Sequence, residues 1–220
     1  MNPELEQYFS SARLAPYLLP GEAADVAFAR YQWNLRLAEA LLPSLNYLEV
    51  GLRNGLNRTV ANLYGADWLL TISPKLGLSF EDLRNIENLK TDIQETKGYP
   101  ATHNDVLARL GFGFWVAFFH KRYVSGLWNR GKSPLVSVFP NMVPALQTRE
   151  LIFARLRTIK ALRNRIAHHE PIWKMTPTVD EVHRTCLEIV SGMSGAAAEE
   201  LAKIDRFSSV YTQGLNVSRG

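Results

Sequence analysis

Cysteine is almost absent from this chain of 220 residues, because Cys186 is the only one. A single cysteine excludes a disulfide within the chain and a cysteine-rich structural zinc site. His183 lies three residues before Cys186, but two side chains on one helix do not make a metal site, so we expect no metal and no cofactor. The low cysteine content is typical of a reducing compartment, and we expect a cytoplasmic protein.

Long hydrophobic runs are also lacking. The most apolar stretch, residues 111–119, is followed at once by His120, Lys121 and Arg122, whereas a membrane-spanning helix needs about 20 apolar residues. The first 16 residues contain two glutamates and no apolar core, which is not the pattern of a secretory signal. We therefore expect a soluble protein with no membrane partner, and we interpret residues 111–119 as a buried helix.

Two further absences narrow the class of protein. The sequence has no glycine-rich phosphate loop and no sustained alternation of apolar and polar residues, which disfavours nucleotide-binding α/β folds and β-sheet proteins. The 25 Lys and Arg against 21 Asp and Glu give a net charge of +4, which permits a polyanionic partner without requiring one. A hydrophobic content of 46% is normal for a globular protein.

Apolar residues recur instead at intervals of three and four almost throughout, which predicts an all-α protein. A first helix is expected over residues 22–42, after which Pro43 acts either as a kink or as the first residue of a new helix reaching residue 64. The apolar side of the first part comprises Phe28, Tyr31, Leu35, Ala38 and Leu42, and that of the second part Leu45, Leu48, Leu52, Leu56 and Val60.

Capping boxes mark three more helix starts, namely Ser79 with Asp82, Thr102 with Asp105, and Thr178 with Glu181. They predict helices over residues 79–97, 102–119 and 178–190. Two more helices are expected over residues 148–169 and, in an alanine-rich stretch, up to about residue 205. Residues 125–144 contain two glycines and three prolines and are expected to be the longest irregular segment, functional or mobile. We expect one domain over residues 1–205, with a core of about 22–191 and a flexible tail over 206–220.

The predicted helix over residues 148–169 carries the residues of chemical interest. Arg157, Lys160, Asn164 and His168 follow one another at spacings of three, four and four, so they line one exposed ridge. Cations that hold phosphate and an imidazole that moves protons are what a metal-free ribonuclease needs, since RNA supplies its own nucleophile in the 2′-hydroxyl. Basic residues also gather in the last turns of ordinary helices, where they complement the helix dipole. The opposite, core-facing stripe comprises Ile152, Leu156, Ile159, Leu162 and Ile166.

Arg163 falls at the edge of that apolar stripe, about 140° around the helix from His168. A straight helix cannot point both side chains at one atom. Either the helix distorts before Pro171, or the long arginine swings round, or a second protomer completes the site. A buried arginine needs a carboxylate, and Glu49 is one hypothesis for its partner. A local pair between Glu49 and Arg53 is the simpler alternative.

The string LRNRIAHHEPI over residues 162–172 resembles the signature of the Abi-like (abortive infection) proteins, a branch of the HEPN superfamily. The ribonuclease motif of that superfamily is an arginine, four to six residues and then a histidine, often with a polar residue after the arginine. Arg163, Asn164 and His168 match the four-residue spacing, and His169 would match five. Residues 45–54 and 111–116 resemble the same family, so the resemblance spans about residues 28–172.

This resemblance implies a HEPN-like helical bundle, here with extra N- and C-terminal helices, that forms a homodimer with the two motifs facing each other. It also implies metal-independent RNA cleavage by the 2′-hydroxyl, which leaves a cyclic phosphate, in bacterial phage defence or toxin-like growth arrest. A non-coding RNA or an antitoxin is a possible partner. Arg163 and His168 are then catalytic and Asn164 positions the RNA. His169 is the alternative proton carrier, although His168 is favoured because it shares a face with Asn164.

Further RNA contacts are expected from basic residues on this helix and around the irregular segment, with Tyr123 and Trp128 as candidates for base stacking. A solvated basic loop, anchored to the core by these two aromatic side chains, is the alternative. The basic residues are Arg157, Lys160, Arg165, Lys121, Arg122, Arg130 and Lys132. A second function remains open, a non-catalytic RNA-binding or regulatory HEPN module, and a third is a structural dimerisation domain. His103, at a helix start, is expected to be structural.

Overall fold

The computed structural model describes residues 2–130 and 133–215, and every regular element in this part of the chain is helical. The fold is therefore all-α, as the sequence predicts. The helices are α1 (Pro3–Phe9), α2 (Ser11–Leu14), η1 (Ala15–Tyr17), α3 (Ala24–Tyr64), η2 (Pro74–Leu76), α4 (Phe80–Lys97), α5 (His103–Arg109), α6 (Phe112–Ala117), η3 (Lys121–Tyr123), η4 (Val124–Trp128), α7 (Pro134–Val138), η5 (Pro144–Leu146), α8 (Arg149–Ala167), α9 (Val179–Met193), α10 (Gly195–Ile204) and α11 (Phe207–Gln213). No helix in these two ranges is long and apolar enough to cross a membrane.

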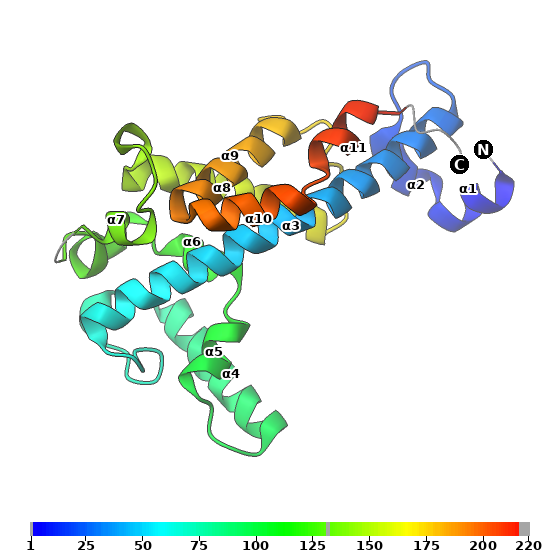
Figure 1. Cartoon of the computed structure of the whole chain (residues 1–220). Coiled ribbons are helices and arrows are strands. Elements are labelled where there is room, and N and C mark those ends of the chain that lie inside the picture. The colour runs from blue at the N-terminus through cyan, green and yellow to red at the C-terminus, as the bar shows by residue number, and fades with distance from the viewer. Residues whose placement is uncertain (1, 131–132, 216–220) are drawn as a thin grey trace.

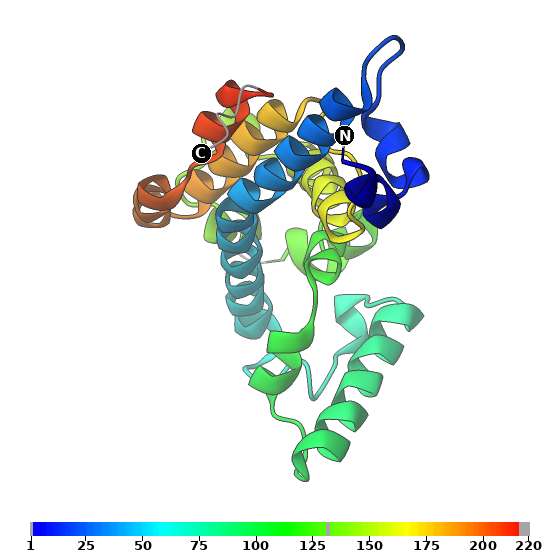
Figure 2. The same ribbon diagram turned by 90° about the vertical axis from the view of Figure 1, so that its right-hand side faces the viewer.

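Helix α3 is the long axis around which the other elements pack (Figure 1). It is 41 residues long and contacts α6, α7, α9, α10 and α11 along its length. Helix α8 packs against α6 and α9. Helices α4 and α5 pack on each other and project away from the rest of the bundle (Figures 1 and 2). The N-terminal helices lie at the opposite end, beside the first turns of α3 (Figure 1).

Pro43 lies inside the continuous helix α3, so the prediction that it begins a new helix is wrong. The predicted apolar stripe of the second half is buried throughout, from Leu45 to Val60. The stripe predicted for the first half is wrong in part, because Leu35 and Leu42 are 44% and 54% exposed. The buried face of the first half of α3 is instead formed by Arg30, Asn34, Leu37 and Leu41.

Two of those buried residues are polar, and each meets a partner that lies far along the chain or in a loop. The Asn34 Oδ1 atom accepts hydrogen bonds from the backbone N–H groups of Ile172 and Trp173, at 2.7 and 3.3 Å. The Arg30 guanidinium forms two hydrogen bonds of 2.7 Å to the Glu22 carboxylate. A helical pattern that assigns polar residues to solvent therefore misplaces this face.

All three predicted capping boxes are present, at the N-termini of α4, α5 and α9. The single helix predicted over residues 102–119 is wrong, because α5 ends at Arg109 and α6 begins at Phe112. Leu110 between them is extended and buried, and its carbonyl oxygen accepts a hydrogen bond of 3.2 Å from Trp115 Nε1. The hydrogen bond to the indole takes the place of a continued helical one.

The segment expected to be irregular is in large part packed against the core in its described residues, 125–130 and 133–144. It contains most of η4 and all of α7. Trp128 and Phe139 are buried, and Trp128 Nε1 donates a hydrogen bond of 2.7 Å to the Phe118 carbonyl oxygen. Burial of large aromatic side chains holds a segment that its prolines and glycines alone would leave irregular.

The predicted flexible tail is wrong for its first part, because residues 207–213 form α11. Phe207 is fully buried, and Trp33 Nε1 donates a hydrogen bond of 3.1 Å to the Val210 carbonyl oxygen. Residues 216–220 lie outside the described residues.

Candidate functional site

Helix α8 presents the predicted ridge to solvent because its opposite face is buried in the core. Thr148 caps its N-terminus by accepting a hydrogen bond from the Leu151 N–H. The apolar stripe from Ile152 to Leu162 is buried, and only Ile166, near the C-terminal end, is half-buried. Burial of four large aliphatic side chains fixes the rotation of the helix about its axis.

A cleft of about 410 Å³ lies alongside this ridge. Arg157, Lys160 and Asn164 line it from α8. Gly113 of α6, His120 and Arg122 of the following segment, and Glu81 and Asp82 of α4 are among the residues that line its other walls. Three of the four ridge residues predicted from spacing therefore share one concave surface. His168 lies one turn beyond Asn164, about 6 Å further along the helix axis.

The cations of α8 fall into two groups. Arg149, Arg155 and Arg165 form ion pairs with Glu150, Glu188 and Glu170, respectively. Arg157, Lys160 and Arg163 form no ion pair with any residue in the described part of the chain. The unpaired group lies on the cleft or next to the motif, so positive charge there is left available for an anion.

His120 enters the cleft in a defined tautomer. Its Nδ1 atom faces two donors, the backbone N–H and the Nε–H of Arg122, at 3.3 and 3.4 Å. An imidazole nitrogen that accepts hydrogen bonds carries no proton, so the proton of the neutral ring is on Nε2. The His120 ring lies edge-to-face against Phe153, with centroids 6.1 Å apart. His120 is a residue that the sequence did not single out.

The C-terminal end of α8 is held by the N-terminal segment of the chain. His168 is the C-cap residue, and its N–H donates to the Asn164 carbonyl oxygen at 2.9 Å. His169 adopts a left-handed backbone conformation with φ of 55°. Arg13 Nη2 donates a hydrogen bond of 2.6 Å to the His169 carbonyl oxygen. The two histidines therefore sit on a turn that a distant helix fixes.

The motif side chains Arg163, Asn164, His168 and His169 are all exposed. The expectation that Arg163 is partly buried and needs a carboxylate is wrong, because the side chain projects into water where its charge is solvated. The backbone does leave the helix before Pro171, at His169 with φ of 55°, but His168 still bonds Asn164 as in a regular helix. The distortion therefore comes too late to bring His168 towards Arg163. A swing of Arg163 or a second protomer remains.

Glu49 and Arg53 are both half-buried on α3. Among the described residues, Glu49 forms an ion pair neither with Arg53 nor with Arg163. The Arg53 Nε atom is buried without a hydrogen-bond partner in this part of the chain. Their supporting role stays a prediction.

The basic loop places its cations and its aromatic side chains in different environments. Lys121, Arg122 and Arg130 are exposed, while Lys132 lies outside the described residues. Tyr123 is buried and stacks on Phe118, with ring centroids 4.8 Å apart. Trp128 is buried as well. The hypothesis that Tyr123 and Trp128 stack on bases is therefore wrong, and the alternative of aromatic anchors under a basic loop holds.

The remaining histidines and the cysteine are inside the protein. His103 Nε2 lies 3.0 Å from Asn57 Oδ1, and burial lowers the pKa of the His103 imidazole. His183 lies 2.9 Å from the Asp205 carboxylate. Burial raises the pKa of the Cys186 thiol to about 12, so this thiol is protonated and unreactive at neutral pH. No group of three His, Cys, Asp or Glu residues suited to a metal is found within the described ranges.

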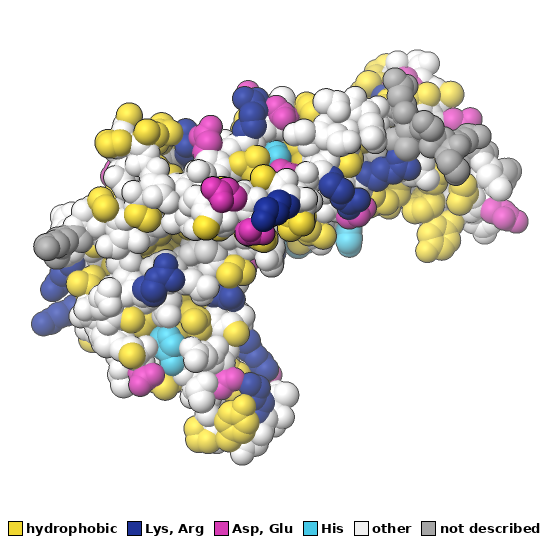
Figure 3. All heavy atoms as spheres, in the orientation of Figure 1, with side chains coloured by type: hydrophobic (Ala, Val, Ile, Leu, Met, Phe, Trp, Pro, Cys, Tyr) yellow, Lys and Arg dark blue, Asp and Glu magenta, His cyan; other side chains and the backbone are white. Residues whose placement is uncertain are grey.

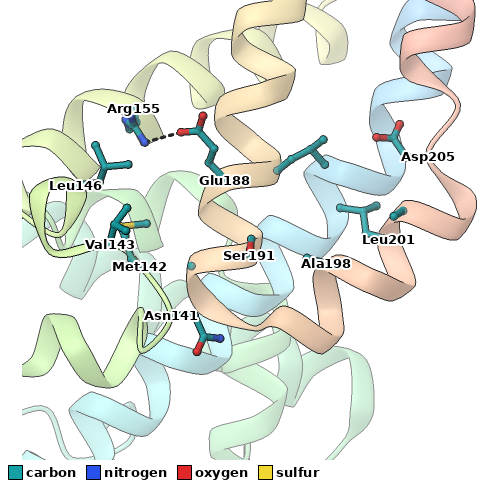
Figure 4. Close-up of a pocket in the computed structure, with 13 residues that line it drawn as sticks. Asn141, Met142, Val143, Leu146, Arg155, Glu188, Ser191, Ala198, Leu201 and Asp205 are labelled. Carbon is teal, nitrogen blue, oxygen red and sulfur yellow. Dashed lines mark hydrogen bonds and ion pairs between the residues drawn. The ribbon is translucent and has the colours of Figure 1, made fainter.

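A larger cavity of about 570 Å³ lies between α8, α9, α10 and residues 141–146 (Figure 4). An ion pair of 2.9 Å between Arg155 and Glu188 lies at its edge, and Leu146, Val143 and Leu201 contribute apolar surface. None of the motif or ridge residues lines it. Size alone therefore does not identify it as the site, and the cleft beside α8 has the better-suited chemistry.

Basic side chains do not gather into one large patch on the face shown in Figure 3, where Lys and Arg are scattered among Asp and Glu. Recognition of a polyanion on that face would have to be diffuse. The unpaired cations beside α8 are a local concentration, which a net charge of +4 alone does not reveal.

Two residues that stabilise the segment around the motif, Asn34 and Arg13, were not predicted from the sequence, for different reasons. Asn34 had a signal, since it is a polar residue between apolar positions of α3 that are buried in the fold. Arg13 had none, because its partner, the His169 carbonyl, is 156 residues away and belongs to the backbone. In comparisons with protein-family models, with curated proteins and with solved structures, no match to this chain was found.

Proposed function

We propose that this chain is an RNA endonuclease of the HEPN type, which acts without a metal ion in bacterial abortive infection or toxin-like growth arrest. The observation that carries the proposal is the exposure of Arg163, Asn164 and His168 together at the end of α8. Arg163 has no ion pair with any described residue, so its charge is free for a phosphate. The unpaired cations of the adjoining cleft support the same class of partner.

In the proposed reaction the ribose 2′-oxygen attacks the neighbouring phosphorus and loses its proton to a base. The bond from phosphorus to the 5′-oxygen breaks, and the departing oxygen receives a proton. The products are a 2′,3′-cyclic phosphate and a 5′-hydroxyl. The His168 imidazole moves one of these protons, because imidazole exchanges protons near neutral pH. The Arg163 guanidinium stabilises the charge that builds up on the phosphate oxygens.

The geometry of α8 favours a site shared between two chains. Arg163 and His168 point about 140° apart around a helix that is regular up to Ala167. We therefore place the reacting phosphate between Arg163 of one protomer and His168 of the partner subunit. Two equivalent sites then form across a two-fold axis.

Single variants test the chemistry. Arg163→Ala and His168→Ala should each abolish cleavage of RNA in buffer containing EDTA, while the far-UV circular dichroism stays that of the wild type. End-group analysis should find cyclic phosphates on the wild-type fragments. Undiminished cleavage by both variants would overturn the proposal, and capture of one intact RNA without cleavage by the wild type would favour a binding module.

A mixing experiment tests the shared site. When the two inactive variants are unfolded together and refolded, half of the dimers are mixed, and each mixed dimer has one site with both groups intact. Activity should then return to roughly a quarter of the wild-type value. If each chain contained a complete site of its own, mixing would restore nothing, and a monomer by light scattering would exclude sharing.

A further inference from the structure

The cleft beside α8 brings together donors that lack acceptors. Lys160, Arg157 and His120, whose side chains end in an ammonium, a guanidinium and an imidazole, all line it. None of them has a hydrogen-bond acceptor or an ion-pair partner among the described residues, and the Arg157 guanidinium lies 5.8 Å from the centroid of the Phe153 ring. A lining of donors suits a ligand whose oxygens only accept, and a phosphate group is such a ligand.

Gly113 makes room for one of these donors. A Cβ atom at position 113 would lie 3.2 Å from Lys160 Cε and 3.3 Å from Lys160 Nζ. The end of the Lys160 side chain therefore rests against the α6 backbone, and a Cβ atom at position 113 would push it aside by a few tenths of an ångström. Glycine at this position and lysine at 160 together set where the positive charge enters the cleft.

The carboxylates of the cleft are fewer than its cations. Asp82 is already occupied, because its Oδ2 accepts hydrogen bonds from the Ser79 hydroxyl at 2.6 Å and from the Tyr123 hydroxyl at 3.1 Å. Glu81 is exposed in the first turn of α4 and forms no ion pair within the described ranges. Arg122, Arg157 and Lys160 outnumber the two carboxylates by one, so the net formal charge of the lining residues is positive.

Aromatic surface lies beside the cations. The half-buried Phe153 ring contacts the His120 ring on one side and the Arg157 guanidinium on another. Unpaired bases of RNA stack on aromatic rings and on arginine planes. A volume of about 410 Å³ is that of a pocket for a small ligand, so it accommodates a single nucleotide unit and not a duplex.

We propose that this cleft binds one nucleotide of single-stranded RNA next to the cleavage position. Lys160, Arg157 and the His120 Nε2–H hold its phosphate, and the base rests against Phe153 and His120. Asn164 belongs both to the cleft and to the motif, so a strand held here continues along α8 towards His168. The assignment of RNA as the polyanion rests on the proposed function, while the phosphate site stands on the cleft itself.

Binding to an uncleavable probe tests the cleft separately from catalysis. The probe is a short fluorescein-labelled oligonucleotide with 2′-O-methyl riboses, which lack the attacking hydroxyl, and the readout is fluorescence anisotropy at several salt concentrations. Lys160→Gln, Arg157→Gln and His120→Ala should each weaken binding about tenfold. The slope of log K against log salt should become shallower by about 0.7 for each lost cation.

Two variants separate the position of charge from its amount. Gly113→Ala keeps every charge but pushes the end of the Lys160 side chain aside by a few tenths of an ångström, so binding should weaken while the protein melts no lower than the wild type. Glu81→Gln removes a repelling carboxylate and should strengthen binding. Lys203→Gln and Arg184→Gln remove cations from α10 and α9, away from the cleft, and should leave the affinity within twofold, as expected for about 0.4 kcal/mol or less.

The outcomes separate this proposal from the nuclease proposal. If the cleft variants bind the probe like the wild type, the cleft is not the binding site. The same conclusion follows if the α9 and α10 control variants lose as much affinity as the cleft variants. Absence of binding by the wild type would also overturn it. Retained binding with lost cleavage in His168→Ala supports both proposals, whereas full cleavage by His168→Ala removes only the catalytic assignment.

Discussion

Arg13 donates a hydrogen bond of 2.6 Å to the backbone carbonyl of His169, so a residue of the short helix α2 fixes the turn that carries the motif histidines. The same guanidinium lies 5.6 Å from the centroid of the Tyr31 ring on α3. Lys174 reinforces the link by donating a hydrogen bond of 3.0 Å to the Pro16 carbonyl oxygen. The N-terminal segment therefore contributes to the geometry of the site without lining it.

Loss of this link should impair the site more than the fold. Arg13→Gln is expected to cost about 1 kcal/mol of stability, the usual net value of one hydrogen bond, and to lower kcat for RNA cleavage with little change in KM. Arg13→Lys retains a charged donor and should restore part of kcat. A variant that melts normally and cleaves RNA at the wild-type rate would show that the turn needs no support from Arg13.

Asn34 should be indispensable for the segment after the motif. Asn34→Ala removes the acceptor for two backbone N–H groups, of which that of Ile172 is buried, and should lower the free energy of unfolding by about 2–3 kcal/mol. Asn46 is exposed on the same helix, so Asn46→Ala is the matched control and should change stability by less than about 0.5 kcal/mol. Chemical denaturation measures both, and equal effects would contradict the assigned role.

The left-handed backbone conformation of His169 makes it possible to distinguish the roles of the two motif histidines by substitution. Because φ is 55° there, glycine is the residue best suited to the position, and His169→Gly should be more stable than His169→Ala by about 1 kcal/mol. If His168 is the proton carrier, His169→Gly keeps most of the RNA cleavage and His168→Ala loses it. Melting temperatures and initial cleavage rates of the three variants decide both points, and the reverse order of activities would assign the chemistry to His169.

Gly126 should tolerate no side chain. A Cβ atom there would lie 2.6 Å from the carbonyl oxygens of Lys75 and Leu76, and backbone atoms yield less readily than the end of a flexible side chain. Gly126→Ala is expected to cost about 3 kcal/mol or more. Gly111→Ala is the control, since nothing lies within 4 Å of its Cβ position. Thermal melts of both variants provide the comparison, and a neutral Gly126→Ala would disprove the close approach.

Two buried histidines should make stability fall in mild acid. Burial lowers the pKa of His183 and of His103, although the Asp205 carboxylate partly opposes the shift at His183. In the unfolded chain these imidazoles take up protons as pH falls through about 6.5. The folded protein takes them up only at lower pH. The stability that the neutral rings contribute is therefore fully present above about pH 6.5, and it is lost as the pH falls from there through the lower pKa of the folded protein.

The measurement is the free energy of unfolding between pH 7.5 and pH 5. Its decline should be shallower in His183→Gln, by at most about 1.4 kcal/mol per pH unit for the one proton removed. His169→Gln changes an exposed histidine and serves as the control, with the slope of the wild type. Identical slopes in all three proteins would exclude His183 as a titrating group of the fold.

Local interactions made several features readable from the sequence alone. Helix starts such as Ser79 with Asp82 were predictable because a capping box is closed by residues three apart. The buried stripe of α8 and the ridge of Arg157, Lys160 and Asn164 followed from helical periodicity, which depends on no other segment. The ridge of α8 was therefore predictable without tertiary information.

Only the tertiary structure decided what meets that ridge and what holds it. His120 and Gly113 enter the cleft from a different part of the chain, and Arg13 and Asn34 reach backbone groups more than 130 residues away. Helix α3 turned polar residues inward, and α5 and α6 separated where Trp115 bonds the Leu110 carbonyl. Sequence periodicity reports how each helix divides its own faces, but hydrogen bonds between distant segments, which satisfy buried polar groups, arise only when the chain has folded.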